Sequence, residues 1–240
     1  MTFSSGNHGQ GLAWAAHLCN LTCTVVVPRG TPKVKTDAIQ GDEICAEFNK
    51  PDDVAYIPGS DDIHVIAGQG TIALEFLQQV PYLDAIFVAT GSGGVIAGVA
   101  VAAKSINPQI KSKRLWSSPP QLIETIADGI RAQPIVKSAW PIVLRMVEKD
   151  VFTVSDEEII QGMRFSLERM KLLTEPATGA TIAAVMSEKM KTLDPNIRNI
   201  GVILCGGNTD VENLPWLTRF VYILISYVLL WILTTHVEIF

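Results

Sequence analysis

The chain has 240 residues, of which 48% are hydrophobic and 18% charged, and its formal net charge at pH 7 is -5. This balance is typical of a globular protein with a buried core and excludes a disordered chain. No run of Lys or Arg is present, which excludes nucleic acid as an expected partner. The four cysteines form no CxxC pair, and this favours a reduced, cytoplasmic location.

Short helices and strands alternate in the first third of the chain. Residues 10–20 predict a helix that ends at Asn20, and Cys23–Val27 predicts a buried strand. His17, Cys19 and Cys23 are either metal ligands or, as their apolar surroundings favour, a histidine beside two buried structural thiols. The next predicted elements are a helix over 33–40, at most a weak strand over Val54–Ile57, and a helix over 66–79.

The clearest strand is Ala85–Thr90, which runs into Gly91-Ser92-Gly93-Gly94 and then a predicted Ala-rich helix over 95–105. A strand, a glycine loop and a helix in this order are typical of a phosphate site in a parallel sheet, because the loop amides and the helix N-terminus face the anion. The spacing is not GxGxxG, and no acidic residue ends a following strand, which disfavours a dinucleotide.

The rest of the chain continues the alternation of helices and strands. Ser155, with Glu158 three residues later, predicts a capping box at a helix start. The predicted elements are helices over 121–131, 138–148, 155–171 and 178–192, and a buried strand over Ile200–Leu204. The sequence therefore predicts an α/β fold, a parallel sheet with helices on both faces.

Two more loops of small residues adjoin predicted elements. Residues 4–10, Ser-Ser-Gly-Asn-His-Gly-Gln, lie directly before a helix, where they either approach a ligand or simply cap the helix. Residues 205–208, Cys-Gly-Gly-Asn, follow the last strand, where they either place a thiol near a ligand ring or simply form a turn. Together with the loop 91–94, they are expected to meet in one crevice at the carboxyl ends of the strands.

Six motifs in this order resemble the serine racemase and serine/threonine dehydratase family, the fold type II (tryptophan synthase beta-like) enzymes that use pyridoxal 5'-phosphate (PLP). The motifs are residues 4–10, 67–75, 91–94, 125–129, 168–176 and 206–208. The resemblance covers residues 4–210. It implies a remnant of an incomplete small domain over 1–65, a large PLP-binding domain over 66–212 and an apolar C-terminal tail over 213–240.

The resemblance also implies roles for single residues. Asn7 would bond the 3-hydroxyl of PLP, and Cys205 would face its pyridine nitrogen. Glu175 matches an acidic residue near the cofactor ring and the site of a divalent cation. The amides that would bind the phosphate belong to Gly91, Ser92, Gly93, Gly94 and Val95. The substrate pocket would be lined by Ser4, Ser5, Asn7 and His8, with Ser5 exchanging a proton at the substrate Cα.

The sequence departs from the family pattern at three places. The family's Schiff-base lysine lies in a Ser-x-Lys-x-Arg-Gly motif upstream of residues 4–10, and residues 1–240 contain no lysine in that context. The stretch between Gln40 and Pro58 is shorter than in the family. Residues 114–120 replace a stretch that carries acidic cation ligands. We therefore expect a chain truncated at its N-terminus, weak or lost PLP binding and an incomplete cation site.

The resemblance implies PLP-dependent racemisation of serine or its β-elimination to pyruvate and ammonia, with little activity left in these 240 residues. Serine and a second copy of the chain are the implied partners. One alternative is a non-catalytic protein that pairs with a full-length relative. Another is a membrane protein anchored by Phe220–Val237, an uncharged stretch of 18 residues near the lower limit for a bilayer span.

Overall fold

The computed structural model describes residues 1–4, 6–27, 54–115, 124–131 and 135–216. It divides into two compact units, Met1–Asn208 and Thr209–Phe240. In the described part of the second unit, Asp210 accepts hydrogen bonds from Glu212 N at 3.0 Å and from Asn213 Nδ2 at 2.7 Å. The predicted domain boundaries stay predictions.

Some predictions concern residues beyond the described ranges. The predicted helix over 33–40 and the stretch Phe220–Val237 both lie outside them. Within the described ranges, the structure contains no helix with the length and apolar character needed to cross a bilayer. Membrane anchoring through the tail therefore stays a prediction.

A four-stranded parallel sheet forms the centre of the first unit. Its strands are β3 (Ala85–Ala89), β4 (Lys111–Leu115), β5 (Val147–Phe152) and β6 (Ile200–Val202), in the order β5-β4-β3-β6. All neighbouring strands run parallel. β3 is buried along its whole length, as a wholly apolar parallel strand requires. The predicted α/β fold with a parallel sheet is confirmed.

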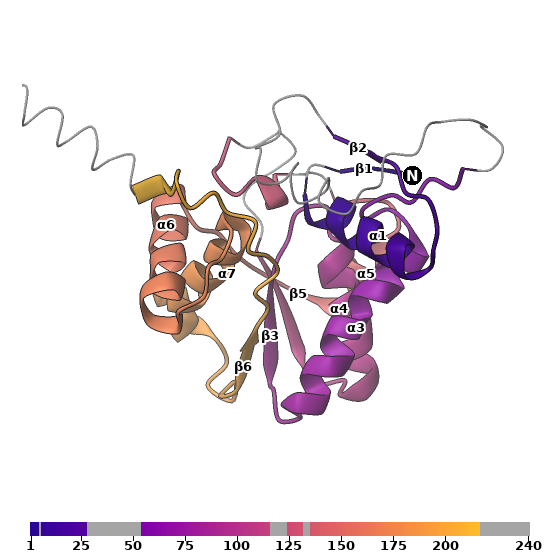
Figure 1. The fold of residues 1–240 in the computed structure, drawn as a ribbon. Coiled ribbons are helices and arrows are strands. Elements are labelled where there is room, and N and C mark those ends of the chain that lie inside the picture. Colours follow the sequence, from indigo (N-terminus) through magenta and orange to yellow (C-terminus); the bar gives the residue numbers. More distant parts are fainter. Residues whose placement is uncertain (5, 28–53, 116–123, 132–134, 217–240) are drawn as a thin grey trace, which may run out of the picture. The chain divides into compact units, whose positions relative to one another are not determined.

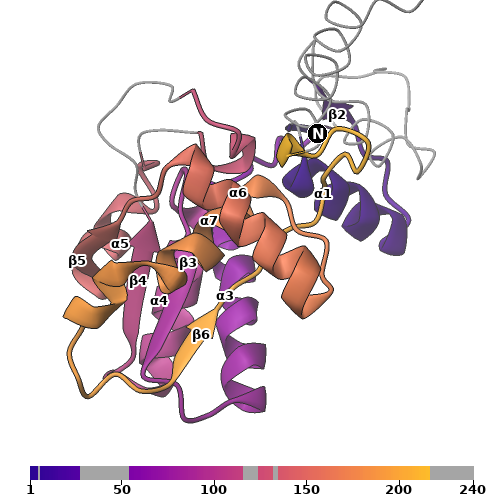
Figure 2. The ribbon, with the colours of Figure 1, turned by 90° about the vertical axis from the view of Figure 1, so that its left-hand side faces the viewer.

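Helices cover both faces of this sheet, as Figures 1 and 2 show. One face carries α3 (Ile63–Gln79), α4 (Gly94–Ile106) and α5 (Trp140–Met146), and the other carries α6 (Asp156–Phe165) and α7 (Pro176–Met186). Ile86 and Val88 belong to the core on the first face, whereas Ala85 and Phe87 pack with Ala184 of α7. The alternating side chains of β3 therefore join the two cores.

The N-terminal part holds a small parallel sheet of β1 (Thr2–Phe3) and β2 (Val25–Val26), together with α1 (Asn7–Leu18). α1 begins at Asn7 rather than at residue 10, so the last four of the seven residues of the motif 4–10 lie in its first turn. Residues 54–57 form no strand; Ile57 N instead donates to Met1 O at 2.8 Å. Cys23 is buried as predicted, but Cys19 is exposed because it stands at the open end of α1.

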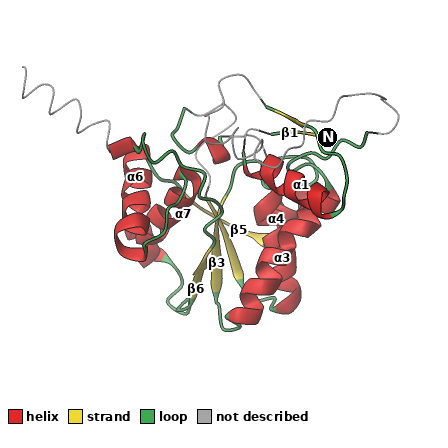
Figure 3. Cartoon of the chain, viewed as in Figure 1, coloured by secondary structure: helices red, strands yellow, loops and turns green. Residues whose placement is uncertain are grey.

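Figure 3 shows the observed helices, strands and loops, and several of them differ in length or type from the predicted elements. The helix predicted over 121–131 is wrong for residues 124–131, which contain only the short 3-10 turn η2 (Asp128–Ile130). The helix predicted over 155–171 is α6 followed by one π-helical turn, η3 (Ser166–Met170). The helix predicted over 178–192 is α7, which ends at Met186, followed by the 3-10 segment η4 (Glu188–Thr192).

Candidate functional site

The glycine loop Gly91–Gly94 joins the carboxyl end of β3 to α4. Gly93 has a φ of 92°, in the left-handed region that favours glycine, and a Cβ there would lie 2.7 Å from Ile135 Cγ2. Val136 N donates to Ser92 O at 2.9 Å, which ties the loop to the segment before α5. The first amides of α4 have no acceptor within the helix. A negatively charged group would suit this end of α4.

Chain segments on two sides hold the glycine loop closely. A Cβ on Gly91 would lie 3.0 Å from Ile130 Cα, and one on Gly94 would lie 3.1 Å from Ser60 Cβ. Neither position has room for a side chain unless a neighbour moves. The loop is therefore fixed between the turn η2 and the residues that precede α3.

A thiol lies just beyond the end of β6, the strand next to β3. Cys205 has exposed surface, but protein surrounds its sulfur. Loss of water around the thiol, with a smaller contribution from the negative charge of Glu175, raises the pKa of Cys205 to about 11. The thiol is therefore protonated and uncharged at neutral pH.

Glu175, the N-cap of α7, is a carboxylate only 3% exposed. Its Oε1 accepts from Asn7 Nδ2 at 3.0 Å. Asn208 Nδ2 donates to Asn7 Oδ1 and, at 3.3 Å, to Gln10 Oε1. A Cβ on Gly206 would lie 2.5 Å from the carboxyl carbon of Glu175. The first turn of α1, the turn after β6 and the start of α7 therefore meet at one buried carboxylate.

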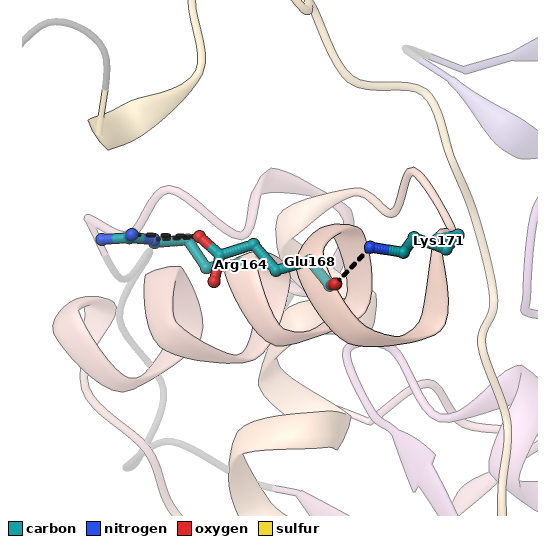
Figure 4. Close-up of polar contacts among 3 residues, drawn as sticks. All are labelled: Arg164, Glu168 and Lys171. Atoms are coloured by element: carbon teal, nitrogen blue, oxygen red, sulfur yellow. Dashed lines mark hydrogen bonds and ion pairs between the residues drawn. The ribbon is translucent and has the colours of Figure 1, made fainter.

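The helix before this carboxylate ends abruptly. Lys171 has a φ of 62°, in the left-handed region, and Leu172 N donates to Ser166 O at 3.1 Å. Figure 4 shows two further contacts: Arg164 Nη2 pairs with Glu168 Oε1 at 3.0 Å, and Lys171 Nζ donates to Glu168 O at 2.7 Å. The left-handed turn at Lys171 ends the helix four residues before Glu175, while the exposed ion pair adds little stability.

In the N-terminal loop, the side chains of Ser4 and His8, which were predicted to bind the substrate, form hydrogen bonds within the protein. Ser4 Oγ accepts from the amides of Gly6 and Gly9, at 3.2 and 3.0 Å. His8 Nε2 lies 3.1 Å from Thr2 Oγ1 and 3.3 Å from the main-chain oxygen of Ile57. Ser5 lies outside the described residues.

A glycine loop at a helix N-terminus, an uncharged thiol and a buried carboxylate thus share one end of the sheet. The family model "Pyridoxal-phosphate dependent enzyme" matches residues 1–206. The chain belongs to this enzyme family. The serine racemase of Rattus norvegicus is 38% identical over an alignment of 250 positions, and this alignment covers 91% of this chain and 74% of that protein.

Two other comparisons widen the range of relatives. The L-threo-3-hydroxyaspartate ammonia-lyase of Saccharomyces cerevisiae is 33% identical over an alignment of 245 positions, and this alignment covers 88% of this chain and 73% of that protein. The crystal structure of a PLP-dependent aspartate racemase aligns with a TM-score of 0.83 and 42% identity, covering 90% of this chain and 75% of that one. The family thus includes relatives named for racemisation and for ammonia elimination.

The residues at this end of the sheet fit the cofactor of this family. The left-handed turn at Gly93 and the open end of α4 suit a phosphate dianion. The protonated thiol of Cys205 suits a pyridine nitrogen that carries no charge. Within the described ranges, no group of three or more His, Cys, Asp or Glu side chains could hold a metal ion. The role of Glu175 near a cation stays a prediction.

Two polar residues of the crevice had no predicted role, Gln10 and Asn208. Both belong to motifs that had been singled out, but 198 residues separate them, and no periodicity links such distant positions. The Nε2 of Gln10 is buried and has no hydrogen-bond partner among the described residues. Their meeting follows only from the fold.

Proposed function

We propose that this chain binds PLP and serves the racemisation or β-elimination of a small amino acid, with serine as the first candidate. Its relatives include serine racemases and an L-threo-3-hydroxyaspartate ammonia-lyase. The observation that carries the proposal is the convergence of the loop Gly91–Gly94, Cys205 and the Asn7–Glu175 pair at the carboxyl ends of β3 and β6. In open α/β sheets, ligands bind at that edge.

The glycine loop and Asn7 would bind two different parts of the cofactor. The amides of Gly91, Ser92, Gly93, Gly94 and Val95 would hold the phosphate. Asn7 Nδ2 donates one hydrogen to Glu175, and its second hydrogen can point to the 3-hydroxyl oxygen of the ring. The buried carboxylate would then orient the Asn7 amide toward the ring.

Cys205 would determine how strongly the pyridine ring of PLP withdraws electrons. When bound, PLP withdraws electrons from the Cα of an amino acid. An uncharged thiol at the pyridine nitrogen keeps this withdrawal moderate, which suits racemisation and β-elimination. Ser5 would exchange a proton at Cα. Ser4 and His8 would shape the pocket for the substrate carboxylate through the contacts that fix the loop 4–9.

We further propose that a polypeptide of residues 1–240 holds PLP reversibly, because none of its lysines lies in a Ser-x-Lys-x-Arg-Gly context. Borohydride reduction with PLP present should leave no lysine stoichiometrically labelled. The check is peptide mapping by mass spectrometry. Stoichiometric labelling of one lysine would contradict the proposal.

The phosphate assignment is tested by titrating PLP into the wild type, Gly93→Asp and Gly68→Asp while following protein fluorescence. Gly93→Asp adds a negative charge and a strained φ at the anion site, so its Kd should rise at least about tenfold, equivalent to about 1.4 kcal/mol. Gly68 lies in α3 with nothing within 4 Å of a Cβ, so Gly68→Asp is the matched control. Equal affinity in all three proteins would show that the assignment is wrong.

A second candidate function is a non-catalytic subunit that pairs with a full-length relative. The observation that favours it is an exposed apolar row on and just after α1, namely Trp14, Leu18 and Leu21, whose side chains are 56, 68 and 64% exposed. Light scattering of the chain, alone and mixed with the relative, tests this. Pairing that Leu18→Glu abolishes would support it, whereas a monomer in both samples contradicts it.

A further inference from the structure

Residues 124–131 form a loop that lies against both the glycine loop Gly91–Gly94 and the buried Glu175. On one side, Ile130 Cα lies 3.0 Å from the position of a Cβ on Gly91. On the other side, a Cβ on Gly129 would lie 3.4 Å from Glu175 Oε1. The position of this loop therefore affects both the glycine loop and the buried carboxylate.

Asp156, the first residue of α6, anchors this loop. Its Oδ1 accepts from Thr125 Oγ1 at 2.5 Å, and its Oδ2 accepts from Ile126 N at 3.2 Å. Thr125 Oγ1 in turn accepts from Ala127 N at 3.2 Å. The guanidinium of Arg131 donates to Thr125 O at 2.6 and 2.9 Å, which closes the loop. The carboxylate of Asp156 thus holds Thr125, the residue to which Ala127 and Arg131 of the same loop are hydrogen-bonded.

The start of α6 is itself well fixed. Ser155 N donates to Glu158 Oε2 at 2.7 Å, and Glu158 N donates to Ser155 Oγ at 3.3 Å, a complete capping box. Because this pair serves the helix end, the carboxylate of Asp156 is available for bonds outside the helix. Ile159, 3% exposed, anchors the same turn in the core.

We propose that Asp156 is a positioning residue of the cofactor site: it holds the loop 124–131 so that the Ile130 backbone supports Gly91. The proposal rests on the proposed function of Gly91–Gly94 as the phosphate site. When Asp156 is replaced, Thr125 Oγ1 and Ile126 N lose their acceptor. The loop then relaxes, and the glycine loop loses one of its walls without losing any phosphate ligand.

The test compares hydrogen exchange and PLP affinity in polypeptides of residues 1–240. Asp156→Ala removes both acceptors, and Thr125→Val removes the hydroxyl at nearly constant shape. Each should speed amide exchange over 126–131 and over Gly91–Val95, and raise the Kd for PLP several-fold. Thr125→Ser retains the hydroxyl and should restore both readouts, which a general loss of stability would not allow.

Two further variants make the test specific. Ser155→Ala weakens the cap of the same helix but keeps the carboxylate of Asp156, so exchange over Gly91–Val95 should match the wild type. The double variant Asp156→Ala with Thr125→Val should show less than the sum of the two single effects, because both single variants remove the same Thr125–Asp156 contact. Fully additive effects, or faster exchange over Gly91–Val95 in Ser155→Ala, would contradict the positioning role.

The two proposals fail in different ways. If the wild type and Gly68→Asp do not bind PLP, the proposed function is wrong, and exchange over Gly91–Val95 alone decides the role of Asp156. If PLP binds but Asp156→Ala changes neither that exchange nor the Kd, the positioning role is wrong and the proposed function stands.

Discussion

Two glycine-containing turns follow neighbouring parallel strands, yet they differ in what surrounds them. The turn after β3, Gly91–Gly94, leads at once into α4, so its backbone faces the positive end of a 13-residue helix. The turn after β6, Cys205–Gly207, is not followed directly by a helix, since residues 208–214 form none, and it packs against the buried carboxylate of Glu175. Similar residues at the same edge of the sheet thus meet opposite charges.

The difference shows that small residues only permit a close approach, while the neighbouring elements select the chemistry. A helix N-terminus favours an anion, as a phosphate needs. Loss of water around the Cys205 thiol and, to a smaller extent, the nearby carboxylate disfavour its thiolate, and an uncharged thiol suits an uncharged ring nitrogen. This contrast supports the proposal that the two turns face the two ends of a single cofactor.

The largest expected effect tests the backbone of the first turn. Gly93→Ala places a Cβ at a φ of 92° and 2.7 Å from Ile135 Cγ2, so it should lower the free energy of unfolding by about 2–4 kcal/mol. Gly68→Ala, in the exposed face of α3, should instead raise it by about 0.5–1 kcal/mol. Urea unfolding of both variants checks this. Equal urea midpoints for Gly93→Ala and Gly68→Ala would mean that a side chain at residue 93 does not strain the turn.

The second turn should tolerate a methyl group better. In Gly206→Ala the Cβ would meet the carboxyl group of Glu175, which can rotate only by giving up its bond from Asn7. We expect a loss of about 1–2 kcal/mol in the free energy of unfolding. The same urea experiment measures it, and a loss larger than that of Gly93→Ala would reverse the expected order of the two turns.

A third prediction concerns the negative charge of Glu175, which lies beside the second turn. Glu175→Gln removes the negative charge but keeps an acceptor for Asn7 Nδ2. The pKa of the Cys205 thiol should fall below about 11 and stay above 9.0, because loss of water is the larger cause of its rise. The pH dependence of alkylation, followed for the Cys205 peptide by mass spectrometry, measures it. An unchanged pKa would exclude the carboxylate as a cause.

The smallest effect is expected at the opposite ends of the same strands. Backbone N–H groups of Asn199 and Arg198 donate to Asp84 and lower its pKa below 3.8. A carboxyl whose folded pKa is lowered stabilises the protein above its unfolded pKa, and this contribution is lost as pH falls through the folded pKa. Asp84→Asn should therefore be less stable than the wild type near neutral pH.

That difference between Asp84→Asn and the wild type should vanish as the pH falls below 3.8. Urea unfolding across this range measures the pH dependence. A difference that persists unchanged at the acid end would mean that Asn199 and Arg198 do not favour the charged form of Asp84.

Local patterns predicted much of the frame. Ser155 and Glu158 form the capping box that their spacing indicated, and Ala85–Ala89 is a buried strand followed by a glycine loop and α4. These features depend on neighbours in the sequence, because a cap needs a residue three positions away and a buried strand needs a short apolar run. The order of strands and helices then sufficed for the fold class, whereas the family resemblance rested on the six sequence motifs.

The predictions failed for elements whose conformation depends on residues far away in the sequence. β4 reads Lys-Ser-Lys-Arg-Leu and was not predicted, because charged residues hide a strand that exists through pairing with β3 and β5. Residues 124–131 looked helical, but Asp156 offers the loop hydrogen bonds that compete with a helix.

The sequence by itself determined which small and polar residues are present, where α4 and α6 start to within one residue, and which family the motifs resemble. Only the tertiary structure decided that Asn7 meets Glu175 across 168 positions and that the pKa of the Cys205 thiol rises to about 11. The physical reason is that hydrogen bonds and pKa values depend on distance and burial. For residues far apart in the chain, both are set by how the helices and strands pack.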